Sequence, residues 1–195
     1  METIKKYIGD FKLLLDRIEC TDLRGGMINF PAAIGCACVL IRGLAGSGLK
    51  LMFIGNGGSA AICSHMATDF SKNGGIAAMA FNDASMLTCM GNDFGYEHVF
   101  AKPIELFAAK GDYLVAVSSS GQSRNILNAV AAARVKGCAV ITLSGFKTDN
   151  PLRAMGDINF YVPVEHYGYV EVIHQYICHT IIDNLSVNIN ERYHG

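Results

Sequence analysis

The sequence predicts an α/β protein in which a parallel sheet lies between layers of helices. Five short apolar segments occur between residues 51 and 162, and most are followed by Gly, Ser or Asn and then by a helical pattern. Continuous apolar runs of this length are typical of strands buried on both faces. Strands that alternate with helices form βαβ units and a parallel sheet. Hydrophobic residues make up 51% of the 195 residues and charged residues only 17%, which is enough apolar material for an extensive core.

Two helices are expected before the first strand. Apolar residues recur three and four apart between residues 4 and 18, with charged residues between them, which is the pattern of an amphipathic helix. A second helix, over about residues 31–44, would have Pro31 in its first turn, where proline is favoured. This segment is apolar on nearly every side, which suggests burial, including burial in a subunit interface.

The five strands and a final helix would complete a single domain. Residues 1–47 are expected to form the N-terminal helices, and residues 48–195 the α/β core. A long helix over about residues 169–188 would close the three-layer fold. The strands are expected at residues 51–54, 76–81, 113–117, 139–143 and 158–162.

Composition and charge exclude several classes of protein. The 16 Lys and Arg residues balance 17 Asp and Glu residues for a formal net charge of −1, which argues against a nucleic-acid partner. The longest apolar run, residues 32–41, is about half the ~20 residues that a spanning helix needs, so no membrane partner is expected. Charges recur near the N-terminus and leave no signal-peptide core, which favours the cytoplasm. The seven cysteines include no CxxC pair and are expected to be reduced, small core residues.

Two loops at expected strand ends carry small and polar residues suited to a ligand. Ligands of open parallel sheets bind beyond the carboxyl ends of the strands. Each loop precedes a helix, whose free N–H groups and positive dipole favour an anion such as a phosphate. A structural interpretation is also open, because a Gly-rich segment can be only a turn and serines are common N-caps. The first loop holds Asn56, Gly57, Gly58 and Ser59, and the second holds Ser118, Ser119, Ser120 and Ser123.

The spacing of these loops excludes the common nucleotide sites. Neither loop has the G-x-G-x-x-G pattern of a dinucleotide site, and neither has the Gly-Lys-Ser/Thr of a P-loop. No nucleotide cofactor is therefore expected, and a small phosphorylated molecule fits better.

Two expected helices carry side chains that could bind a metal ion. His65 and Asp69 are four residues apart and share one helix face. Glu171 and His179 are eight residues, or about two turns, apart on the final helix. Histidine and carboxylate are both common zinc ligands. The alternative is a plain helix pair and a final helix that simply carries polar residues.

Three motifs together resemble a known family. Gly55-Asn56-Gly57-Gly58-Ser59, the serine loop, and Gly91-Asn92-Asp93-Phe94-Gly95-Tyr96 between them are similar to the sugar isomerase (SIS) domain. They resemble more closely the sedoheptulose 7-phosphate isomerase (phosphoheptose isomerase) family, over essentially the whole chain. The resemblance implies a five-stranded parallel sheet flanked by helices, and a homotetramer with active sites between subunits.

The resemblance also implies a role for each site residue. The phosphate would be held by Ser118, Ser119, Ser120 and Ser123. Other substrate contacts would come from Asn56, Gly57, Gly58, Ser59, Asn92, Asp93 and Glu171. Zinc would be bound by His65, Asp69, Glu171 and His179. Asp69 would be the catalytic base, and His179 would supply the complementary proton. Asp69 stands where the family has Glu, and Glu171 stands where it has Gln. These two differences bear on the geometry of the site and on the identity of the substrate.

The implied activity is the isomerisation of sedoheptulose 7-phosphate to D-glycero-D-manno-heptose 7-phosphate through an enediol. This reaction supplies heptose for bacterial surface polysaccharide, including lipopolysaccharide. Two alternatives stand beside it: an isomerase of another sugar phosphate, and a non-catalytic SIS protein similar to a regulator of replication initiation. The presence of His65, Asp69 and His179 argues against the regulator, because a scaffold has no need of these residues.

Overall fold

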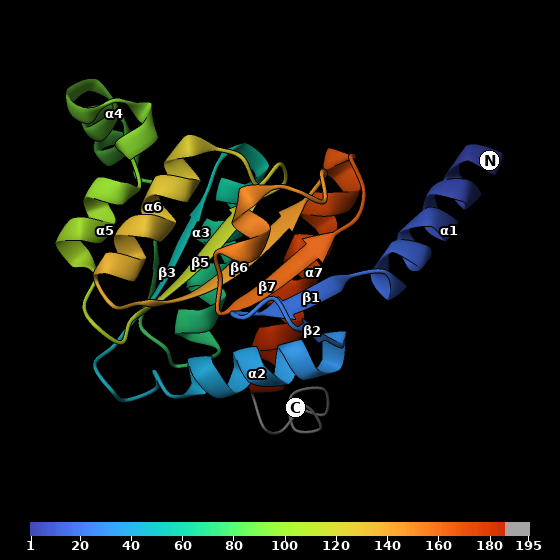
Figure 1. The fold of residues 1–195 in the computed structure, drawn as a ribbon, viewed down its shortest axis with the longest axis horizontal. Coiled ribbons are helices and arrows are strands. Elements are labelled where there is room, and N and C mark those ends of the chain that lie inside the picture. The colour runs from blue at the N-terminus through green and yellow to red at the C-terminus, as the bar shows by residue number, and fades with distance from the viewer. Residues whose placement is uncertain (186–195) are drawn as a thin grey trace.

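The computed structural model describes residues 1–185 and contains one sheet of seven strands, in the order β2-β1-β7-β6-β5-β3-β4 (Figure 1). Five strands run parallel and overlap the five predicted segments, which confirms the α/β class and the parallel sheet. They are β3 (Leu51–Gly55), β4 (Ala78–Ala80), β5 (Tyr113–Ser118), β6 (Ala139–Gly145) and β7 (Ile158–Val162). Both β3 and β7 are buried at every residue, as expected for strands covered on both faces.

Two further strands extend the sheet and were not predicted. β1 (Glu19–Asp22) pairs antiparallel with β7 and with β2 (Met27–Ile28). Only Cys20 of β1 is buried, and β2 has only two residues, so neither strand shows the apolar run or alternation that identifies a strand. The hairpin covers the edge of the parallel sheet that β7 would otherwise expose. Residues 1–47 therefore contribute strands as well as the two predicted helices.

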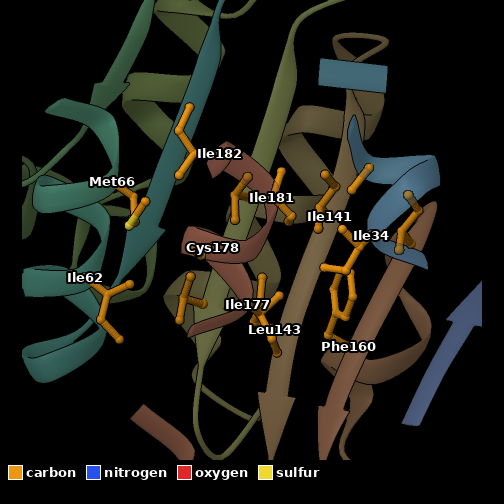
Figure 2. Close-up of a cluster of buried hydrophobic side chains, with 14 of the residues drawn as sticks. Ile34, Ile62, Met66, Ile141, Leu143, Phe160, Ile177, Cys178, Ile181 and Ile182 are labelled. Atoms are coloured by element: carbon orange, nitrogen blue, oxygen red, sulfur yellow. The ribbon is translucent and has the colours of Figure 1, made fainter. Parts of the chain in front are cut away.

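One face of the sheet is covered by α2 (Phe30–Arg42), α3 (Gly57–Lys72) and α7 (Tyr167–Leu185). Figure 2 shows α7 between the other two helices, with Ile177 and Cys178 packed among Met66 of α3 and Leu143 of β6. The start of α2 is as predicted, since Pro31 lies in its first turn and the Asn29 side chain accepts a hydrogen bond from the Ala32 N–H. The last predicted residues of the final helix, 186–188, lie outside the described residues.

The opposite face is covered by α5 (Ala101–Phe107) and α6 (Arg124–Val135), with the short helices η1 (Tyr96–His98) and η2 (Pro151–Ala154). Ile126 and Val130 of α6 pack on Leu114 and Ala116 of β5 in this second core. The helix α4 (Ala84–Phe94) buries none of its residues and projects at one end of the molecule (Figure 1). The resulting three layers confirm the predicted architecture.

The first helix, α1 (Glu2–Asp16), extends away from the sheet (Figure 1). Leu14 is the one residue of α1 that is buried, while Ile4, Ile8 and Leu13 are exposed. The predicted helix is confirmed, but its own chain does not cover its apolar face.

The helices and the cysteines of the described residues bear on two expectations from the sequence. None of their helices combines the length and the apolar character needed to cross a membrane. All seven cysteines are free thiols, and five are buried as expected, but Cys36 and Cys89 are exposed. The exposed pair corrects the expectation that the cysteines fill the core. Cys36 lies on the outer side of α2, and Cys89 lies on the projecting α4.

His174 links α7 to the sheet from a fully buried position. Its Nε2 lies 3.1 Å from the Ser144 carbonyl oxygen of β6, and none of the described residues forms a hydrogen bond with its Nδ1. Burial lowers the pKa of His174 from 6.5 to about 4, against an opposing effect of the Ser144 hydrogen bond. The imidazole is therefore neutral in the folded protein near neutral pH.

We predict that acid weakens the fold through His174. Between pH 6.5 and about 4 the unfolded chain binds a proton at this residue that the folded protein excludes, so stability falls as the pH falls through this range. The free energy of unfolding should drop by on the order of 3 kcal/mol across it. Urea unfolding of the metal-free protein at fixed concentration measures this slope. The His174→Gln variant, whose amide can still donate to Ser144, should show a shallower slope, and equal slopes would contradict the prediction.

Candidate active site

The two predicted ligand loops meet at the carboxyl end of neighbouring strands. β3 and β5 pair in parallel, so the loops that follow Gly55 and Ser118 lie side by side. Between them is a small pocket of about 100 Å³, called here the serine pocket. Its lining residues are Asn56, Ser59, Ser118, Ser119, Ser120, Ser123, Tyr167 and Glu171. The structure thus brings together all four serines of the second loop with two residues of the first.

The hydroxyl groups of the serine pocket are only partly used by the protein. Ser118 accepts a hydrogen bond from the Gly121 N–H, and Ser120 accepts one from the Gln122 N–H. Ser119 is 5% exposed, and its Oγ has no hydrogen-bond partner in the described part of the chain. A buried hydroxyl without a partner costs about 1–3 kcal/mol, and a bound anion with several oxygens would remove that cost. The start of α3, at Gly57, also borders the pocket and favours negative charge.

The serine loop depends on one glycine. Gly121 has a φ of +62°, and a Cβ at this position would overlap the Asn150 side chain. Asn150 in turn donates hydrogen bonds to the carbonyl oxygens of Gly145 and Lys147. A larger residue at position 121 would therefore strain the loop and displace the serines.

Asn56 is held by residues that the sequence analysis did not identify. Asn56 and Asn125 exchange two side-chain hydrogen bonds of 3.0 and 2.8 Å, and the Tyr96 hydroxyl donates a third to Asn56 Oδ1 at 3.1 Å. These bonds tie the first loop to the start of α6. The signals were local, because Asn125 lies two residues after Ser123 and Tyr96 ends the Gly91–Tyr96 motif.

A second cavity of about 600 Å³ adjoins the serine pocket and shares Asn56 and Ser123 with it. The other lining residues are Tyr96, Glu97, Arg124, Asn125 and Asn128. Arg124 brings a positive charge next to the serine loop, and the sequence analysis did not predict it. Arg124 directly follows Ser123 in the sequence, and this position could have identified it as a residue near the serine loop.

The predicted metal-binding residues come together in part. His65 Nε2 lies 3.5 Å from Asp69 Oδ2, and His179 Nδ1 lies 3.9 Å from the same oxygen. One ligand atom from each of the three side chains lies within 4.8 Å of the others. Two imidazoles and one carboxylate are a donor set that suits zinc and other divalent transition metals. We call these three residues the His-Asp-His group.

Glu171 lies apart from the His-Asp-His group. It lines the serine pocket, where its carboxylate packs against Gly58 so closely that a Cβ there would overlap it. The separation follows from the helix, because residues 171 and 179 are about 12 Å apart along the α7 axis. The predicted fourth metal ligand is therefore placed at the opposite end of the site.

Asn92 and Asp93 also lie away from both groups. They are exposed on α4, where the Asn92 amide donates to the Asp93 carboxylate. Neither residue lines the serine pocket.

Comparison with known proteins places this chain in a family. The profile described as SIS domain matches residues 31–145. A phosphoheptose isomerase of Enterobacter sp. (strain 638) is 39% identical over 158 residues, which are 77% of this chain and 81% of that protein. One from Helicobacter hepaticus is 37% identical over 167 residues, which are 83% of this chain and 84% of that protein. The solved phosphoheptose isomerase of Neisseria gonorrhoeae superimposes with a TM-score of 0.81 at 28% identity, covering 95% of this chain and 98% of its own. On its motifs, fold and relatives, the chain belongs to the phosphoheptose isomerase family of SIS-domain proteins.

Proposed function

We propose that this protein isomerises sedoheptulose 7-phosphate to D-glycero-D-manno-heptose 7-phosphate, in the cytoplasm, for the synthesis of surface polysaccharide. The observation that carries the proposal is the serine pocket, in which the buried Ser119 hydroxyl has no hydrogen-bond partner among residues 1–185. The helices that border this pocket, α3 and α7, also hold the His-Asp-His group. Membership of the phosphoheptose isomerase family supports the same activity.

The spacing along the two helices suits a long sugar phosphate. Ser59 and Asp69 are ten residues apart on α3, and Glu171 and His179 are eight apart on α7. At a rise of about 1.5 Å per residue, the serine pocket and the His-Asp-His group are separated by roughly 12–15 Å along the helices. This is of the order of an extended seven-carbon sugar phosphate. A phosphate in the serine pocket would then direct the carbonyl end toward Asp69 and His179.

The reaction needs an acid and a base at that end. One proton leaves a carbon beside the carbonyl and another is added to the neighbouring carbon, with an enediol between the two steps. In our proposal the Asp69 carboxylate takes and returns the carbon-bound proton, and the His179 imidazole exchanges protons with the oxygens.

The proposal also includes a zinc ion. His65, Asp69 and His179 would hold it. Glu171, the fourth ligand that the family resemblance implies, lies in the serine pocket and is not part of this proposed zinc site. A bound zinc ion would polarise the carbonyl group of the substrate. A residue that binds the ion is a poorer base, so proton transfer by Asp69 and His179 requires that the metal leave or shift during turnover.

We predict that the serine hydroxyls dominate phosphate binding. Changing Ser119 and Ser120 together to Ala should weaken binding by roughly 1 kcal/mol or more for each lost hydrogen bond, or at least tenfold in all. KM for the sugar phosphate and inhibition by inorganic phosphate are the measurements. Ser144→Ala is a matched control, because the Ser144 hydroxyl is also buried without a hydrogen-bond partner among the described residues but lies outside the serine pocket. Unchanged values in the double variant would contradict the prediction.

We predict that the wild-type protein moves deuterium from solvent into sedoheptulose 7-phosphate at the carbon beside the carbonyl. The test is a panel of ketose 7-, 6- and 5-phosphates incubated in deuterated water and analysed by NMR. Asp69→Asn and His179→Ala should each lower turnover by roughly 10²- to 10⁴-fold, the range for a lost general acid or base, with smaller effects on binding. Asp69→Glu should remain active.

The same panel separates the alternatives. Deuterium exchange with a shorter ketose phosphate only would favour an isomerase of another sugar phosphate. The Glu171 carboxylate in the serine pocket supports this second candidate. Exchange that persists in Asp69→Asn would contradict the assigned base. A protein with neither bound metal nor turnover would fit the regulatory role instead.

We predict a homo-oligomer, which we propose is a tetramer. Exposed apolar side chains on three helices support association: Ile4 and Leu13 on α1, Val39 on α2, and Val172 and Tyr176 on α7. Association would also allow α4, with Asn92 and Asp93, to reach the site of a neighbouring subunit. Light scattering should give a mass near four chains, and a monomer mass at all concentrations would contradict both proposals.

A further inference from the structure

Gln175 makes a contact that neither the proposed mechanism nor the family resemblance uses. It lies on α7 one turn before His179, and its side-chain Nε2 is 2.9 Å from His179 Nε2. The same atom is 3.3 Å from Met66 Sδ on α3. Met66 is fully buried in the core between the two helices (Figure 2).

The contact has a direct consequence for the His179 ring. An imidazole has two nitrogens, and Gln175 occupies Nε2, so Nδ1 is the one directed at Asp69 Oδ2, 3.9 Å away. The terminal torsion of histidine is roughly two-fold. A half-turn of the ring would place a carbon, which neither binds metal nor transfers a proton, where Nδ1 now lies.

The other contacts given for this ring within residues 1–185 do not fix its direction. His179 is partly exposed, and these contacts are with the Asp69 carboxylate and with the His65 ring, whose centroid lies 5.3 Å from that of His179. Both are groups that would be engaged by a metal or substrate. Of these three neighbours, Gln175 is the one that can hold the ring while taking no part in metal binding or proton transfer.

The amide of Gln175 suits this position because it can both donate and accept. Through its NH₂ group it donates to an unprotonated Nε2, and through its carbonyl oxygen it accepts from a protonated Nε2. It also adds no charge to a site that already contains the Asp69 carboxylate. Histidines that bind metal commonly have the second ring nitrogen held in this way.

We infer that Gln175 is a positioning residue for His179: it holds the ring so that Nδ1 faces Asp69 and any ligand of the His-Asp-His group. The kinetic consequence rests on the proposed function, but the ring orientation and the metal affinity do not.

The test compares three variants of the full-length protein. Gln175→Met keeps the length of the side chain and its contact with Met66 but removes the hydrogen bond. Gln175→Glu restores an acceptor for Nε2. Asn184→Ala is the matched control, because Asn184 also makes a side-chain hydrogen bond one turn back on α7, to the Thr180 carbonyl oxygen, but does not touch the His-Asp-His group.

Two measurements need no sugar phosphate. NMR of ¹⁵N-histidine-labelled, metal-free protein should show one His179 ring environment in wild type and two, or an averaged one, in Gln175→Met. Titration with Zn²⁺ should show affinity lowered roughly 10- to 100-fold in Gln175→Met, with Gln175→Glu and Asn184→Ala close to wild type. His65→Ala identifies the measured site, since it should abolish that binding. If the isomerase activity is present, kcat should fall in Gln175→Met while KM, set at the serine pocket, changes little.

Two results would overturn the inference. One is a Gln175→Met variant with wild-type ring signals and wild-type Zn²⁺ affinity. The other is an equal loss in Gln175→Met and Asn184→Ala, which would mean that only the stability of α7 had changed. Absence of isomerase activity with the expected NMR and Zn²⁺ results would reject the proposed function and leave the positioning role standing.

Discussion

The packing of α3 against α7 is the contact on which the candidate site depends. Both helices start at the carboxyl end of the parallel sheet and lie on the same face of it. Their interface is apolar, with Ile62 and Met66 of α3 close to Ile177, Cys178 and Ile181 of α7 (Figure 2). Burial of each such side chain contributes about 1.5–3 kcal/mol. The core therefore sets the distance between side chains of α3 and α7 at both ends of the site.

The buried His174 adds a directional bond to this packing. Its contact with the Ser144 carbonyl oxygen fixes α7 against β6, the strand next to the one that carries the serine loop. Apolar packing alone tolerates small rotations of a helix about its axis, whereas a hydrogen bond in the core fixes a single orientation of that helix. Glu171 and His179 are thereby held on the side of α7 that faces α3.

The placement of Glu171 separates two negative charges that the family resemblance had put together. One carboxylate, Asp69, lies with the histidines, and the other lies beside Gly58 at the start of α3. The positive end of the α3 dipole stabilises a carboxylate there. A phosphate in the serine pocket would share this same helix end with Glu171. The charge balance of the pocket thus differs from that of a relative with a neutral amide at this position.

Local patterns predicted much of this structure, and contacts between distant residues account for what was missed. The five parallel strands follow from short apolar runs that alternate with helical patterns, and the helix pair His65–Asp69 follows from its four-residue spacing. β1 could not be predicted in that way, because a four-residue strand with one buried side chain carries no pattern. The contact of His179 with Asp69 depends on how α3 and α7 pack. Glu171, two helical turns before His179, contacts Gly58 of α3 instead. The resemblance to a family predicted the first of these but not the second.

The Asn56–Asn125 amide pair has a consequence for the chemical ageing of the protein. Asn56 is followed by Gly57, and an asparagine before glycine is prone to deamidation, in which the next backbone nitrogen attacks the side-chain amide and ammonia leaves. The bonds to Asn125 and Tyr96 restrain that amide in the folded state. If deamidation did occur, the new carboxylate would lose the donor that now meets Asn125 Oδ1, and two oxygens would face each other. The loop would then open at the point where the serine pocket and its neighbouring cavity meet, so an old sample would lose its ligand site before its fold.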